Sequence, residues 1–359
     1  MSRPVVSLRQ ANRYLLARQH LLAKCTDPLQ AVQDACGLQA QVPSVPALSL
    51  RARVAGFKLA DYDRMLVEQR TLIRTWAMRG TVHVVPAAHL PTYTAVYAPE
   101  NGVSEGMQLA LDLLKEGPAT RQQLIARAVA ERGVEQARAE RLFGPWGGVL
   151  RTLARTGLTV HVPTPGADVP LARTEDWLGA QPAPAAREAL EEALLMAYAH
   201  GYGPVTVRDM GHFAGLYIGQ VRPILARLGA RLAEVELEGS SLPHYLPAED
   251  LPELLATTGD EPVPVTLLPR FDSLVLAHRE KSRLLDEANR RDVFREAAVV
   301  EATVLVDGRV VGTWRMKTTT RELRFQFSPF RRMAVRPVKA EAERLAKWLG
   351  LKELVFTQA

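Results

Sequence analysis

Cysteine is scarce in this sequence: only Cys25 and Cys36 occur among its 359 residues. Because neither a CxxC pair nor a histidine tract accompanies them, the sequence supports no disulfide framework and no structural zinc site. No stretch approaches about 18 uninterrupted apolar residues, and the N-terminus lacks the charged start and apolar core of a secretory signal. We therefore expect a cytoplasmic protein with no membrane segment, no metal and no cofactor.

Several familiar catalytic patterns are absent as well. The sequence contains no phosphate-binding GxxxxGKS/T, no GxGxxG after a strand, no HExxH, no GxSxG and no HxE…CxxC deaminase signature. Its eight histidines show no ligand spacing. These absences argue against P-loop and dinucleotide-binding enzymes, zinc enzymes and serine hydrolases.

The charge is distributed unevenly along the chain. The net charge is +6, and residues 308–352 carry twelve Arg or Lys against three Glu, so the basic charge is concentrated near the C-terminal end. Residues 232–269 carry eight acidic side chains and no Lys or Arg. A polyanionic partner such as nucleic acid is therefore expected at the C-terminal stretch, and the acidic segment should face away from it.

The length favours two or three domains, and the element order repeats. Residues 119–132 have helical spacing after Thr120 as a possible N-cap. A second helix is expected at 145–156, followed by strands at 158–162 and 169–172 joined through a turn at 165–168. Helix, turn, helix and hairpin is the order of a winged helix.

The same order returns twice. Helices are expected at 185–200, 206–213 and 216–228, followed by a strand at 231–237 that turns at 238–241. Near the N-terminus, a third copy is plausible. Its expected elements are helices at 7–22, 28–35 and 59–69 and two strands around Arg79-Gly80 in residues 75–84.

Residues 178–186 have the composition of a linker. Beyond residue 255 the pattern changes to strands, with Asp307-Gly308 as a strong hairpin turn. The expected elements are strands at 264–268, 298–306, 309–316 and 322–327, a helix at 339–349, and a strand at 354–357.

Two dense motifs stand out from the repeats. In Gly37-Leu-Gln-Ala-Gln-Val-Pro43, the amides of Gln39 and Gln41 would point the same way from an extended backbone and could converge on one spot. The alternative is two exposed polar residues in a loop. The second motif, Thr75 to His83, is either part of a site or a wing hairpin with Trp76 in the core and Arg79 on a phosphate or in solvent.

Five segments together resemble the AlkZ/YcaQ family of bacterial winged-helix DNA glycosylases. They are Gly-Leu-Gln-Ala-Gln at 37–41, Leu-Ser-Leu-Arg-Ala-Arg at 48–53, Arg-Thr-Trp-Ala-Met-Arg-Gly-Thr-Val-His at 74–83, Leu-Leu-Pro-Arg-Phe-Asp at 267–272, and Leu-Val-Asp-Gly-Arg-Val-Val-Gly-Thr-Trp-Arg at 305–315. The resemblance implies an α+β fold of three tandem winged-helix domains around a C-shaped, basic DNA cleft. We place these domains at 1–106, 107–180 and 181–359, the last with a β-rich basic extension.

The resemblance also implies a monofunctional glycosylase that excises N-alkylated purines such as 7-methylguanine and, in some members, unhooks interstrand crosslinks. The family's catalytic Gln-x-Gln motif falls on Gln39 and Gln41; a sister branch has Asp at the second position. An amide is not a base, so the substrate must supply the driving force. A cationic purine does so as a good leaving group, while two amide carbonyls orient water and stabilise the developing positive charge.

The implied partner is double-stranded DNA with alkylated bases, bound by a monomer associated with the nucleoid. The residues expected to bind DNA are Arg51, Arg53, Arg79, His83, Arg315, Lys317, Arg321 and Arg324. Two alternatives stay open. His83 could stabilise its strand pair rather than contact DNA, and strand alternation could send some of the four cations at 315–324 to a solvated face.

Two other functions fit a chain of winged helices: a non-catalytic transcriptional regulator, and a scaffold that recruits a protein through the acidic segment. A regulator needs base-reading side chains, and the helix expected at 145–156 offers only Arg151 and Arg155. One stretch also departs from the family pattern. In many relatives a glycine-containing tip before the Val-Asp-Gly turn would probe the minor groove, whereas residues 294–301 contain no glycine and two acids.

Overall fold

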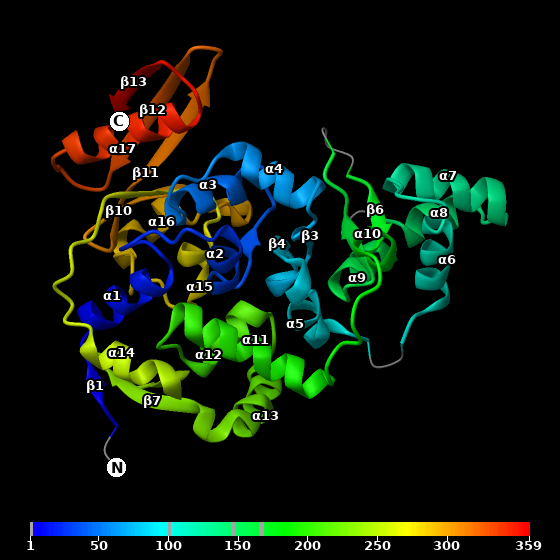
Figure 1. Ribbon diagram of the computed structural model, residues 1–359, viewed down its shortest axis with the longest axis horizontal. Coiled ribbons are helices and arrows are strands. Elements are labelled where there is room, and N and C mark those ends of the chain that lie inside the picture. Colours follow the sequence, from blue (N-terminus) through cyan, green and yellow to red (C-terminus); the bar gives the residue numbers. More distant parts are fainter. Residues whose placement is uncertain (1–2, 100–101, 145–147, 165–168) are drawn as a thin grey trace. The chain divides into compact units, whose positions relative to one another are not determined.

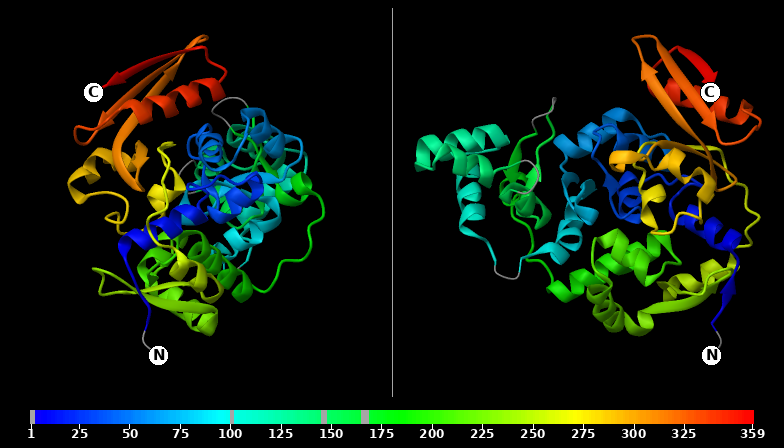
Figure 2. Two further views of the ribbon diagram at one scale, coloured as in Figure 1. Left: turned by 60° about the vertical axis from the view of Figure 1, so that its left-hand side comes forward. Right: turned by 180° about the vertical axis from the view of Figure 1, so that it is seen from behind.

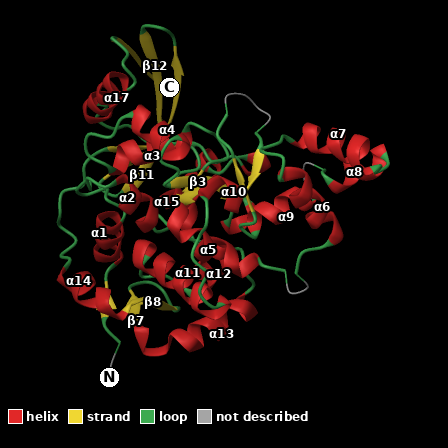
Figure 3. Ribbon diagram, turned by 45° about the vertical axis from the view of Figure 1, so that its right-hand side comes forward, coloured by secondary structure: helices red, strands yellow, loops and turns green. Residues whose placement is uncertain are grey.

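The computed structural model describes residues 3–99, 102–144, 148–164 and 169–359. Backbone contacts divide the chain into two compact units. One comprises Met1–Asp61 together with Leu195–Ala359, and the other comprises Tyr62–Leu194. These units do not coincide with the three expected domains, so the division into three tandem winged helices stays a prediction. The mixed α+β class is confirmed (Figure 3).

Helices, two sheets and the short strand β2 build the first unit (Figure 1). Its helices are α1 (Leu8–Arg18), α2 (Pro28–Asp34), α3 (Val45–Arg53), α12 (Val207–Ala214), α13 (Ile218–Leu228), α14 (Leu251–Ala256), α15 (Ser273–Ala277), α16 (Arg290–Val293) and α17 (Arg336–Trp348). Its strands are β1 (Val5–Val6), β2 (Leu38–Gln39), β7 (Leu232–Leu237), β8 (Pro243–Pro247), β9 (Thr266–Leu268), β10 (Ala302–Val306), β11 (Arg309–Thr318), β12 (Glu322–Pro329) and β13 (Glu353–Gln358).

The second unit also contains both helices and strands. Helices α4 (Leu59–Val67) and α11 (Arg187–Tyr202) each begin in one unit and end in the other. The other helices of the second unit are α5 (Leu90–Thr94), α6 (Glu105–Leu114), α7 (Arg121–Arg132), α8 (Gln136–Leu142), α9 (Val149–Arg155) and α10 (Thr174–Leu178). Its strands are β3 (Leu72–Trp76), β4 (Val82–Pro86), β5 (Thr159–His161) and β6 (Leu171–Arg173), in the spatial order β4-β3-β5-β6.

The C-terminal sheet positions the candidate site. Its five strands lie in the order β13-β12-β11-β10-β9, antiparallel except for the parallel pair β12 and β13. Helix α17 packs on one face through Val338, Ala342 and Leu345, against a stack of Trp314, Phe325 and other aromatic rings. Figure 2 shows α17 lying along these strands. Burial of these side chains stabilises the sheet and leaves its other face open.

Most elements expected from the sequence are confirmed. Thr120 caps α7 in a reciprocal capping box with Gln123, and Thr206 caps α12 in the same way with Asp209. Helices α12 and α13 are followed by the antiparallel pair β7 and β8, which is the expected helix-turn-helix and hairpin order. Residues 179–186 contain no helix or strand, as expected of a linker. The turn at 165–168 and the helix start at 145 lie outside the described residues.

Several elements differ from expectation, and two of them lie beside the candidate site. Strand β10 begins at Ala302 rather than 298, because residues 294–300 form a tight hairpin in which Arg295 N donates to Val299 O at 2.8 Å. Helix α3 was not expected at all. Every residue of it is buried, and a helix buried all round shows no amphipathic periodicity.

None of the described helices combines the length and apolar character needed to cross a bilayer.

Candidate DNA-binding and catalytic site

The Gln-x-Gln segment leaves a short strand and leads into a helix. Gly37, with φ of +84°, ends the turn after α2, and β2 covers Leu38 and Gln39. Beyond Gln39 the chain is irregular until α3 begins at Val45. Gln39 is only 6% exposed, whereas Gln41 is an exposed residue. The extended backbone is thus confirmed for Leu38 and Gln39, and convergence of the two amides stays a prediction.

A fully buried ion pair links α3, the helix that follows this segment, to the start of α15. Arg53, at the end of α3, donates from both terminal nitrogens to the Asp272 carboxylate, at 2.9 and 2.8 Å. Ser49 also donates to that carboxylate, at 2.7 Å, and the neighbouring Ser273 hydroxyl donates to Gly37 O at 3.0 Å. Burial lowers the pKa of Arg53, but the charge and hydrogen bonds of Asp272 outweigh burial and raise it overall.

This pair corrects the expectation that Arg53 binds DNA. Its side chain is 0% exposed, so phosphate cannot reach the guanidinium. Arg51 lies on the same helix, with its side chain 8% exposed and 3.0 Å from Glu341. Arg51 does not line the groove described next; it faces a second pocket at the other end of α3.

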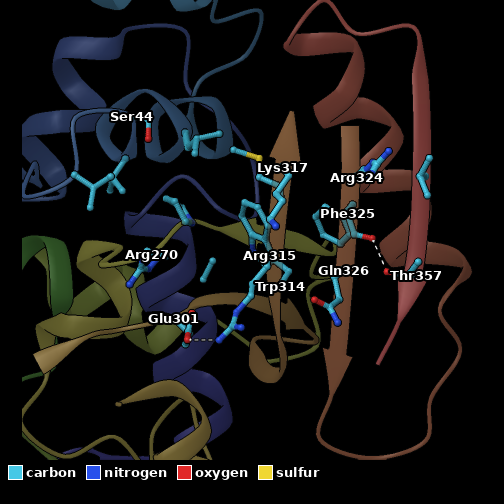
Figure 4. Close-up of a pocket in the computed structure, with 17 residues that line it drawn as sticks. Ser44, Arg270, Glu301, Trp314, Arg315, Lys317, Arg324, Phe325, Gln326 and Thr357 are labelled. Atoms are coloured by element: carbon cyan, nitrogen blue, oxygen red, sulfur yellow. Dashed lines mark hydrogen bonds and ion pairs between the residues drawn. The ribbon is translucent and has the colours of Figure 1, made fainter. Parts of the chain in front are cut away.

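A groove of 980 Å³ begins one residue after Gln41 (Figure 4). One wall is the entry to α3, where Ser44 lies, and the opposite wall is formed by strands β11 to β13. The lining residues are Val42, Ser44, Val45, Leu48, Pro269, Arg270, Glu301, Ala302, Trp314, Arg315, Met316, Lys317, Arg324, Phe325, Gln326, Val355 and Thr357.

Strand alternation gathers three predicted cations on this groove. Trp314 and Phe325 belong to the buried cluster on the α17 face, so Arg315, Lys317 and Arg324 point to the open face. The register sets Lys317 directly opposite Arg324 and Arg315 opposite Gln326. Arg321 lies at the exposed turn between β11 and β12, outside the groove lining.

The groove is electropositive. Its described lining contains four cations, including Arg270, and a single carboxylate, that of Glu301. Glu301 accepts a hydrogen bond from Arg315 at 2.8 Å, which fixes that guanidinium on the groove wall. Sequence reasoning missed Arg270 and Glu301 as groove residues, although Arg270 lies in the Leu-Leu-Pro-Arg-Phe-Asp motif. Such a surface suits a phosphate backbone.

The wing residues Arg79 and His83 lie in the second unit. Arg79 has a φ of +55° in the turn between β3 and β4, and it donates to His83 Nε2 at 3.1 Å. His83 donates from Nδ1 to Thr81 O at 3.0 Å, and only 1% of the residue is exposed. The expectation that His83 contacts DNA is therefore wrong, because its ring is buried and both nitrogens are engaged within the hairpin. Contact between Arg79 and DNA stays a prediction.

We expect His83 to make the second unit acid-sensitive. Burial and then the nearby Arg79 lower the pKa of His83 to about 3, against about 6.5 in an unfolded chain. The unfolded state therefore binds more protons between these values, so stability falls as the pH falls through this window, by up to about 1.4 kcal/mol per pH unit. His83→Asn should flatten this slope in urea unfolding curves measured from pH 7 to 4. An unchanged slope would contradict a buried neutral His83.

Among the described residues, no three His, Cys, Asp or Glu side chains are grouped so that they could hold a metal ion.

Known proteins resemble this chain over nearly its full length. A family model described as DNA glycosylase AlkZ-like matches residues 32–348. The interstrand DNA cross-link repair glycosylase of Streptomyces sahachiroi is 29% identical over 381 aligned residues, covering 97% of this chain and 98% of that protein. The solved structure of Streptomyces sahachiroi DNA glycosylase AlkZ matches with a TM-score of 0.84 and 26% identity, over 99% of this chain and all of that one.

Proposed function

This chain belongs to the AlkZ-like DNA glycosylase family, and from that premise we propose that it excises N-alkylated, cationic purines such as 7-methylguanine as a monofunctional glycosylase. The observation that carries the proposal is the continuity of the Gln-x-Gln segment with the basic groove, whose lining starts at Val42. DNA held by phosphate contacts along the groove would bring a nucleotide toward Gln39 and Gln41.

The residue types suit this lesion class. N7 alkylation makes the purine a good leaving group, so the glycosidic bond loosens toward an oxocarbenium-like sugar without a strong base. The amide oxygens of Gln39 and Gln41 would orient a water beneath C1′ and stabilise the developing positive charge. The water then adds to C1′, its proton is released, and the purine departs with the electron pair of the glycosidic bond.

We also propose crosslink unhooking as a second activity. The similar Streptomyces sahachiroi protein is an interstrand DNA cross-link repair glycosylase, and this chain carries the Gln-x-Gln form of the motif. An N7-linked crosslink presents the same cationic purine leaving group as 7-methylguanine, so the same two amides would serve both substrates. We further propose that the enzyme acts as a monomer near the nucleoid.

The direct test uses a duplex with one 7-methylguanine and a second duplex with one N7-linked interstrand crosslink. After incubation, alkali should cleave the damaged strand of the first duplex at the lesion, because loss of the base leaves an abasic site. Release of one strand from the second duplex would establish unhooking. If both duplexes stayed intact while undamaged DNA bound tightly, a non-catalytic regulator would account for the chain better.

We expect the groove cations to set the salt dependence of DNA binding. Each lost phosphate contact should reduce the slope of log affinity against log salt by about 0.9. Replacing the groove cations Arg315, Lys317 and Arg324, together with Arg321 at the adjacent turn, by Ala should therefore weaken binding to undamaged duplex and flatten its salt dependence. Fluorescence anisotropy at several salt concentrations measures both quantities.

The matched control removes exposed cations from α17, the helix that covers the opposite face of the same sheet. Lys339 and Lys347 lie on α17, and neither lines the groove. Their double replacement by Ala should change the salt slope much less than the fourfold variant does. Equal slopes in the fourfold variant and the wild type would show that DNA binds elsewhere.

A further inference from the structure

A second pocket of 350 Å³ lies in the first unit, at the opposite end of α3 from the groove. The loop after α1 contributes Lys24, the end of α3 contributes Arg51, and α17 contributes Glu341, Arg344 and Trp348. None of its lining residues is shared with the groove. On α3 the groove lining ends at Leu48 and the pocket lining begins at Arg51, three residues or about 4.5 Å of helix rise further along.

Three cations in this pocket share one carboxylate. Glu341 lies 3.0 Å from Arg51 and accepts a hydrogen bond from Arg344 at 2.5 Å. Lys24 donates to the backbone oxygen of Arg51 at 2.6 Å, and its ammonium is close enough to both guanidinium groups to be repelled by them. No other described lining residue is acidic. The pocket therefore holds two positive charges more than its protein groups neutralise.

The crowding of these cations has an electrostatic consequence. Burial lowers the pKa of Lys24, and the neighbouring Arg51 and Arg344 lower it further against the opposing effect of Glu341. Burial likewise lowers the pKa of Arg51, with a smaller contribution from Arg344. An anion bound among these side chains would relieve their mutual repulsion. Lysine and arginine around one point are also the groups that proteins use to hold phosphate.

Apart from Thr266, the rest of the pocket lining is apolar, and it includes the aromatic side chains of Phe57 and Trp348. Trp348 donates from Nε1 to Phe57 O at 2.6 Å, which fixes the indole beside the Phe57 backbone. Leu21, Val54 and Pro264 are among the apolar residues of this part of the lining. The volume is at the lower end of the range of about 300–1,000 Å³ for small-molecule pockets and exceeds that of a phosphate alone. Room therefore remains beside the cations for a sugar or a base.

We propose that Lys24, Arg51 and Arg344 form a phosphoryl-binding site, separate from the groove, that takes the phosphate of a nucleotide with the nucleoside against the apolar wall. The nucleotide is either part of the bound DNA or free in solution. The DNA source rests on the proposed function, because it makes the pocket a second anchor for the substrate. The free source does not depend on glycosylase activity.

The test measures binding rather than catalysis. The full chain is titrated with dGMP and inorganic phosphate by calorimetry, and with undamaged duplex by fluorescence anisotropy. The variants are Lys24→Ala and Arg344→Ala; the Arg344 side chain is 63% exposed, so its removal should leave the fold intact, as circular dichroism would verify. Lys347→Ala is the matched control, because Lys347 is an exposed cation on α17 outside the pocket.

We expect at least a fivefold loss of affinity in both pocket variants and none in the control. If the pocket variants lose affinity for dGMP or inorganic phosphate, the natural ligand is a free nucleotide. If they lose affinity only for the duplex, and the slope of log affinity against log salt falls in magnitude by about 0.9, the ligand is a phosphate of the DNA backbone. Bound phosphate should also protect Lys24 from reductive methylation, measured by mass spectrometry. Unchanged affinities for all three probes, or an equal loss in Lys347→Ala, would overturn the site. Each result can be read even if the chain excises no base.

Discussion

Replacing either Gln39 or Gln41 by Ala is expected to lower the single-turnover rate of 7-methylguanine excision by about 10²-fold or more, the scale seen when one preorganised stabilising group is removed. Neither amide is proposed to contact phosphate, so binding of undamaged duplex should stay nearly unchanged. Because Gln39 is buried and Gln41 exposed, the melting temperature of each variant must be measured alongside the rate. Enzyme in excess separates the chemical step from product release.

Aspartate at the same two positions should give unequal results. Gln41→Asp is expected to retain measurable excision, because a sister branch of the family has Asp there and a carboxylate can assist the attacking water as a base. Gln39→Asp has no such precedent, and its position is nearly closed to solvent, where an ionised carboxylate is costly to bury. Wild-type rates in both alanine variants would remove the catalytic assignment of the glutamines and weaken the proposed function.

The parts of the fold that follow from local sequence were predicted well. Thr120 and Thr206 begin helices through capping boxes, and Asp307-Gly308 turns β10 into β11 because both residues have positive φ. Alternation along β11 and β12 also settles which cations share a face. Arg315, Lys317 and Arg324 meet on the groove because their strand partners are paired in register, while Arg321 lies at the turn.

The errors at the candidate site concern burial, which depends on partners far away in the sequence. Arg53 was expected on DNA, yet its partner Asp272 lies 219 residues later, and no local pattern indicates that pairing. His83 was assigned to DNA for its place on the wing, whereas burial of the strand pair encloses it. Helix α3 escaped prediction because its polar residues Ser49, Arg51 and Arg53 are as buried as its apolar ones.

Breaking the Arg53–Asp272 pair should destabilise the first unit strongly, because both side chains are fully buried. Asp272→Ala would leave a fully buried guanidinium without its carboxylate, and such a loss typically costs about 3–5 kcal/mol. It would also remove the acceptor for Ser49 and the cap of α15, whose Leu274 N–H donates to Asp272 at 3.0 Å. The midpoint of urea unfolding should fall accordingly, and Asp272→Asn should recover part of the loss by keeping an acceptor in place.

Asp272→Ala should also lower the rate of base excision. Asp272 and Ser273 together connect α3 and α15 to Gly37, which lies two residues before Gln39. Below its unfolding midpoint, Asp272→Ala is expected to excise 7-methylguanine more slowly than its folded fraction explains. Arg290→Ala provides the matched control, since it breaks an exposed ion pair with Glu287 that should be worth about 0–1 kcal/mol. If Asp272→Ala proved no more harmful than Arg290→Ala in either measurement, the buried pair would not be what positions the glutamines.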